Sequence, residues 1–118
     1  MRSVIFFNTV HLSVAMKSAI IVSTFPNKKT ATKIANQLVK KKLAACVNIT
    51  KISSVYPWKG KIENQSEYLA LFKTTKTKLQ PLKKELEKLH PYDVPEMVEI
   101  NPISVNKLYL KWLVDSTS

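Results

Sequence analysis

A chain of 118 residues is long enough for one hydrophobic core and too short for two. Hydrophobic residues make up 45% and charged residues 23%, which is a globular composition, and no apolar run is long enough to predict a membrane-spanning helix. The single glycine excludes the glycine-rich loops that bind nucleotide phosphates, and the single cysteine excludes an internal disulfide. We therefore expect one domain in a reducing compartment, the cytoplasm.

The net charge of +11 raises the question of nucleic acid, because lysines that neutralise phosphates release counterions. Arg2 is the only arginine, however, and arginine is the residue whose planar side chain reads guanine edges. A lysine-rich surface also suits solubility or a high-temperature proteome. We expect neither nucleic acid nor a membrane among the partners.

The first fifteen residues make a poor secretory signal, because their short apolar stretch is interrupted by Asn8 and His11. Met16 followed by Lys17 would make a natural start. We interpret residues 1–15 as an N-terminal extension, held against the domain as an added strand, and residues 16–118 as a single domain.

The first predicted elements are a buried strand and an amphipathic helix. Residues 19–25 form a β-branched run that closes at Pro26, and Asn27 is a helix N-cap. Apolar residues then recur at helical spacing: Ala31, Ile34, Ala35, Leu38 and Val39. A lysine run, 40–42, ends the helix where cations interact well with the macrodipole.

Two long strands are predicted to follow, 44–56 and 62–75, joined by a turn at Gly60, the one residue free to adopt a positive φ. The apolar residues of the first strand change parity near Thr50. We expect a β-bulge there.

A second helix is predicted to begin at Thr77 or Gln80, with Pro81 in its first turn. Its buried stripe consists of Leu79, Leu82, Leu86 and Leu89. His90 and Pro91 end the helix, and a short strand at 97–100 follows. Ser104 is expected to cap a last helix, in which one face carries Val105, Leu108, Tyr109, Trp112 and Leu113.

This order of elements predicts an α+β fold of the ferredoxin-like β-α-β-β-α-β type with an added C-terminal helix. Strands of 13 or 14 residues would reach about 45 Å. A compact chain of this length is only about 35 Å across. The hairpin must therefore project, and its exposed strand edges favour pairing within a homo-oligomer.

The chain resembles the CutA family of divalent-cation tolerance proteins over residues 17–114. The resemblance rests on segments in family order: Ser23-Thr-Phe-Pro26, Leu43-Ala-Ala-Cys-Val-Asn48, Val55-Tyr-Pro-Trp-Lys-Gly-Lys61, Glu67 through Lys73-Thr74, His90-Pro-Tyr-Asp-Val-Pro-Glu96 and Tyr109-Leu-Lys-Trp-Leu113. It implies a ferredoxin-like protomer in a homotrimer whose long hairpins pair between subunits. It also implies tolerance of copper and other divalent cations, with copper or zinc as the bound ion.

Three residues are candidate metal ligands: Cys46, His90 and Glu96. A thiolate selects soft ions such as Cu(I) and borderline ions such as Zn(II), and the matching cysteine of the family is the one suspected of binding metal. His90 stands beside Asp93 and Glu96, which supplies imidazole and carboxylate donors. Inert packing is the alternative for Cys46, and helix capping is the alternative for His90.

A second set of residues matches positions that gather around a cleft between subunits in the family. The set consists of Tyr56, Glu67, Lys73, Tyr92 and Trp112. A charged residue on a mostly apolar strand face needs a partner, because burial of an unpaired charge is costly. These residues are therefore either the lining of a small-ligand site or structural pairs between subunits.

The resulting expectation is a non-enzymatic, homotrimeric protein that binds divalent metal ions and is linked to copper tolerance. One alternative is a signalling or scaffold trimer that binds a small ligand in the cleft. Another is an RNA-binding module, but the residues after Lys59-Gly60 do not follow the RNA-recognition pattern. For a hydrolase, Cys46 and His90 lack a third orienting group.

Overall fold

The computed structural model describes residues 17–118, which form four strands and three helices. The extension predicted at residues 1–15, with its added strand, lies outside the described residues. The four strands make one antiparallel sheet in the order β2-β3-β1-β4, which is the ferredoxin-like order. The predicted fold class is confirmed.

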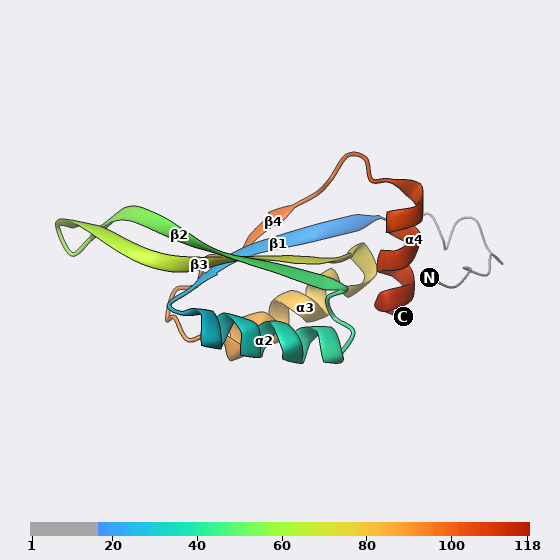
Figure 1. Ribbon diagram of the computed structural model, residues 1–118, viewed down its shortest axis with the longest axis horizontal. Coiled ribbons are helices and arrows are strands. Elements are labelled where there is room, and N and C mark those ends of the chain that lie inside the picture. Colours follow the sequence, from blue (N-terminus) through green and yellow to red (C-terminus); the bar gives the residue numbers. More distant parts are fainter. Residues whose placement is uncertain (1–16) are drawn as a thin grey trace.

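The elements follow one another with short connections (Figure 1). They are β1 (Ser18–Phe25), α2 (Lys28–Lys40), β2 (Cys46–Trp58), β3 (Lys61–Thr75), α3 (Lys76–Leu89), β4 (Val98–Ile100) and α4 (Lys107–Ser116). Helices α2 and α3 lie side by side on one face of the sheet, and α4 stands at the end of the sheet where β1 begins. We call the uncovered face of the sheet the open face.

The hydrophobic core fills the space between the sheet and helices α2 and α3. Alternate residues of β1 and β3, such as Ile21 and Phe72, are fully buried there, and the register pairs these two residues directly. The helices supply the opposing stripes: Ala31, Ile34, Leu38, Leu79, Leu82 and Leu86. These stripes agree with the predicted ones except at Val39, which is 40% exposed.

The predicted β-bulge near Thr50 is wrong. Strands β2 and β3 keep one continuous register from Cys46 paired with Lys73 to Trp58 paired with Lys61. The apolar parity changes because the helical layer ends, so Ile49 packs against the core and Ile52 lies on the open face. The apolar residues of β2 change faces because the helices cover only part of the sheet, and not because the strand contains an inserted residue.

The hairpin projects from the body as expected (Figure 1). The last residue of β1, Phe25, pairs with Tyr68, so residues 61–67 of β3 pair only with β2. The long axis of the molecule measures 56 Å against 26 and 22 Å for the other two. The turn has positive φ at both of its residues, 50° at Lys59 and 77° at Gly60.

The starts of α3 and α4 differ from the prediction. Helix α3 begins directly after Thr75, because β3 continues into it without a loop and the Lys76 amide donates to the carbonyl of Lys17. Pro81 is therefore the sixth residue of the helix rather than part of its first turn. It lies on the exposed side, where water can bind the carbonyl that its ring leaves unpaired.

Helix α4 is capped by Asn106 and not by Ser104, because the Asn106 side chain accepts from the amides of Leu108 and Tyr109. Val105 consequently lies outside the helix. Of the predicted apolar face, Leu113 is buried, whereas Leu108 is 65% exposed. The described part of the chain contains no helix that is long and apolar enough to span a bilayer.

Candidate functional site

A hydrogen-bonded cluster lies where the hairpin leaves the body. The hydroxyl of Tyr92 donates to a carboxylate oxygen of Glu67 at 2.9 Å. Burial, the bond to Glu67 and the nearby Tyr56 all raise the pKa of Tyr92 well above its usual value. The hydrogen bond brings together two of the five residues predicted for the cleft, Glu67 and Tyr92.

His90 anchors the loop that carries Tyr92. Its ring stacks on Phe25 with centroids 4.5 Å apart, and its Nδ1 accepts from the backbone amide of Tyr92 at 3.1 Å. The proton is therefore on Nε2, which donates to the carbonyl of Thr24 at 2.9 Å and lies 3.1 Å from the hydroxyl of Ser23. Burial lowers the pKa of His90, and the bond to Thr24 partly opposes that effect.

The other two predicted cleft residues lie near α4. The Lys73 ammonium sits 5.9 Å from the centroid of the Tyr109 ring, which stacks on Trp112 at 5.6 Å. Lys73 and Glu67 share the open face, but six residues of strand separate them, which is about 20 Å. Within one subunit the predicted cleft residues thus form two clusters, one at the middle of β3 and one near its C-terminal end.

The three predicted metal ligands are also not brought together. Cys46 pairs with Lys73 and lies half-buried on the open face, whereas His90 lies on the helical side of the sheet against Phe25. Glu96 is exposed in the loop before β4. Across residues 17–118, no group of three or more histidine, cysteine or acidic side chains is placed to hold a metal ion.

Three residues that contribute contacts to these clusters were not predicted as site residues. Tyr109 is the residue that contacts Lys73, although only its place on a helical face was predicted. Ser23 and Phe25 hold His90 in place, and no periodicity indicates that the end of β1 contacts a loop more than sixty residues later. Their only sequence signal is their position in the Ser23-Thr-Phe-Pro26 segment of the resemblance.

These features define a class of protein: a ferredoxin-like protomer with a projecting two-stranded hairpin, a loop anchored by a buried histidine, and a C-terminal helix at the end of the sheet. The family model described as "CutA1 divalent ion tolerance protein" matches residues 19–116. The chain belongs to this family.

Named relatives agree with this assignment. The divalent-cation tolerance protein CutA of Pyrococcus horikoshii is 41% identical over 98 residues, which cover 83% of this chain and 96% of that protein. The chloroplastic protein CutA of Arabidopsis thaliana is 42% identical over 106 residues, covering 89% of this chain but only 58% of the plant protein. The chain therefore spans little more than half the length of that relative.

Solved structures match equally well. The periplasmic divalent cation tolerance protein CutA from Archaeoglobus fulgidus superposes with a TM-score of 0.82 at 35% identity, covering 86% of this chain and 99% of that one. The relatives thus include proteins named chloroplastic and periplasmic.

Proposed function

We propose that this chain works in tolerance of divalent cations as a non-enzymatic homotrimer that binds the ion between its subunits. The proposal rests chiefly on the projecting hairpin and the open face, which leave a single subunit incomplete. The names of its relatives supply the physiological context. We place it in the cytoplasm, because its one cysteine forms no internal disulfide.

The hairpin is the strongest argument for a partner. An isolated two-stranded ribbon is marginally stable in water, and this one carries Val55, Trp58 and Ile62, each more than half exposed. Other copies of the same chain are suitable partners, because within residues 17–118 each copy has an uncovered sheet face and a β2 edge that pairs with no other strand. A closed ring of copies would satisfy all of these surfaces at once.

The bound ion requires donors from more than one chain, since no cluster of donors forms within the described part of one subunit. We propose Cys46 as the principal ligand, because its thiol lies on the open face where neighbouring subunits would meet. Glu96 is exposed and can add a carboxylate. Copper and zinc are the ions that suit this donor set.

His90 has a different place in the proposal. Both of its ring nitrogens are engaged within the subunit, so it could bind a metal only by releasing Tyr92 or Thr24. We therefore propose that His90 orients the loop that contains Tyr92 and Glu96, and that its removal affects ion binding indirectly.

A second candidate function follows from the two separated clusters on the open face. In a symmetric trimer, the Glu67–Tyr92 pair of one chain could face the Lys73–Tyr109 pair of its neighbour. The resulting cleft would carry a carboxylate, an ammonium group and aromatic rings, which suits a small polar ligand. Such a trimer would serve signalling or scaffolding.

The first experiment is calorimetric titration of the full chain with Zn(II) and, without oxygen, with Cu(I), together with light scattering. We expect a trimer that binds a whole number of ions, with affinity reduced at least tenfold by Cys46→Ser. Asp93→Asn, in the same loop as Glu96, is the matched control for Glu96→Gln. Saturable binding that Cys46→Ser leaves unchanged would remove Cys46 from the site, and an intact trimer without saturable binding would favour the small-ligand function.

A further inference from the structure

The positive charge of this protein is concentrated on its helical layer. Segments 28–42 and 76–89, which contain α2 and α3, carry eleven lysines and two glutamates, and so account for nine of the net eleven positive charges. The rest of the chain is nearly balanced. This layer lies on the side of the sheet opposite the open face (Figure 1).

Helix α2 has the most uniform charge. Lys28, Lys29, Lys33 and Lys40 are exposed, and the helix contains no acidic residue. None of these four lysines forms a salt bridge with any residue from 17 to 118. Stabilising ion-pair networks need both signs of charge, so thermal stability does not explain this composition.

The placement of these lysines also opposes the helix dipole. Lys28 and Lys29 occupy the first turn of α2, and Lys76 and Lys78 occupy that of α3. Neither first turn contains an acid, and of these four lysines only Lys76 has an acidic neighbour, Glu99 at 3.3 Å. Cations at a helix N-terminus are destabilising, because they add to the positive end of the macrodipole. Solubility alone would be served as well by lysines further along each helix, whereas an anionic partner would benefit from the combined field.

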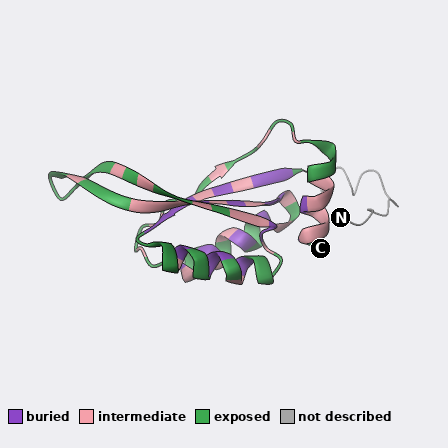
Figure 2. Ribbon diagram, in the orientation of Figure 1, coloured by how far each residue is buried: buried purple, intermediate pink, exposed green. Residues whose placement is uncertain are grey.

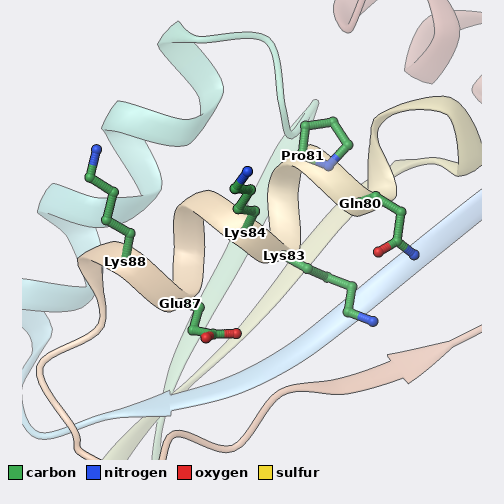
Figure 3. A pocket seen from close by; sticks show the side chains of 6 residues that line it. All are labelled: Gln80, Pro81, Lys83, Lys84, Glu87 and Lys88. Atoms are coloured by element: carbon green, nitrogen blue, oxygen red, sulfur yellow. The ribbon is translucent and has the colours of Figure 1, made fainter.

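The outer side of α3 offers a shallow hollow between such side chains (Figure 3). Lys84 and Lys88 extend to one side of the helix, whereas Gln80 and the carboxylate of Glu87 extend to the other. Lys83 extends to that second side as well, where it lies 3.8 Å from Glu99. On the first side, successive turns present Lys84 and Lys88 about 6 Å apart along the helix axis.

We propose that the outer surface of α2 and α3 binds the sugar–phosphate backbone of nucleic acid without selecting its sequence. Lysine acts as a point charge on phosphate, and hydroxyl and amide side chains also bind phosphates in protein–DNA complexes. Helix α2 exposes such groups at Thr32 and at Asn36, whose amide also donates to the Thr32 carbonyl. Binding to the nucleic-acid backbone requires neither arginines that recognise bases nor the RNA-recognition pattern, both of which serve recognition of a base sequence.

An anionic membrane fits this surface less well. Interfacial helices insert an apolar face into the lipid, but the apolar stripes of α2 and α3 are buried in the core. Figure 2 shows much of the surface of α2 and α3 as exposed. Val39 is the one large hydrophobic residue exposed on these two helices, at 40%. The surface is otherwise polar and basic, which suits a hydrated polyanion.

The test measures binding of the full chain to a labelled single-stranded RNA of about 30 nucleotides and to a DNA duplex of similar length, by fluorescence anisotropy. If about five phosphates of the single strand are neutralised, affinity should fall about a hundredfold between 50 and 200 mM salt. The triple variant Lys28→Gln, Lys29→Gln, Lys33→Gln should weaken binding at least tenfold. Its thermal midpoint should not fall, because the substitutions relieve the conflict with the helix dipole.

The matched control is Lys17→Gln, Lys61→Gln, Lys107→Gln, which removes the same charge from exposed positions outside the layer. It should change affinity by less than about twofold if contacts are local. Equal losses in both variants, or no binding to either probe at low salt, would overturn the proposal. So would binding to vesicles of phosphatidylserine and phosphatidylcholine without binding to nucleic acid. The result is independent of the cation proposal, which concerns the opposite face.

Discussion

The Tyr92 hydroxyl and the Glu67 carboxylate are joined by a hydrogen bond of 2.9 Å between a loop and the strand residue at which the hairpin leaves the sheet. Glu67 directly precedes Tyr68, the last residue of β3 that pairs with β1. The bond therefore ties the base of the projecting hairpin to the loop that His90 anchors.

Tyr92→Phe should lower the free energy of unfolding by about 1 to 2 kcal/mol, because a hydrogen bond to a half-buried carboxylate is lost. Glu67→Gln keeps an acceptor and should cost less. Urea denaturation of both single variants and the double variant measures the coupling between them. Additive effects would show that the bond contributes no energy of its own.

Stability should depend on His90 in mildly acidic solution. The folded pKa lies below the ordinary value of 6.5, so the neutral form is favoured in the native state. This contribution is fully present above pH 6.5 and is lost as the pH falls through the folded pKa. His90→Gln should flatten the decline in denaturation midpoint between pH 7.5 and 5.5. If the denaturation midpoints of the unsubstituted protein and of His90→Gln depend on pH in the same way, protonation of His90 is not the cause of the decline.

The turn residue Lys59 is suboptimal for its conformation. Positive φ at both turn positions is typical of a type I′ hairpin turn, which favours Asn followed by Gly. Lys59→Asn should raise stability by about 0.5 kcal/mol. Gly60→Ala should lower it by about 1 kcal/mol through backbone strain alone, because an added Cβ at φ 77° meets no atom within 4 Å. Thermal unfolding followed by circular dichroism measures both changes.

Pro81 interrupts the hydrogen bonding of α3. As its sixth residue it lacks the amide that would bond to the carbonyl of Thr77. Pro81→Ala should stabilise the protein by about 1 to 2 kcal/mol, since the restored bond outweighs the added freedom of the unfolded chain. Pro26→Ala, before the N-cap of α2, is a comparison in which no helical bond is restored. A loss of stability in Pro81→Ala would show that the proline ring at this position aids packing.

The elements that the sequence predicted best are those with strong periodicity. The buried stripe of α3 and the strand of 19–25 follow directly from apolar spacing, and the α2 start follows from Asn27, whose side chain accepts from the Thr30 amide at 2.8 Å. The prediction of a helix cap was wrong where several polar residues precede the helix. Ser104 and Asn106 are both good caps, and only the path of the preceding loop decides between them.

The candidate site was predictable as a set of residues but not as an arrangement. Glu67 and Tyr92 meet because the loop after α3 returns to the end of β1, which is a tertiary effect. Alternation along β3 does place Glu67 and Lys73 on one face, and the structure agrees. The alternation alone cannot tell whether two such side chains interact within one subunit or between two subunits.

The continuous register of β2 and β3 also bears on how the chain folds. Pairing of these two strands can proceed step by step from the two-residue turn, so each new pair closes only a small additional loop. Pairing of Ser18 with Thr75, by contrast, must bring together the two ends of most of the domain. Contacts between near neighbours in sequence form fastest. We therefore expect the hairpin to form before β1 joins the sheet, so that a newly made chain presents its long strand edges before its core is closed.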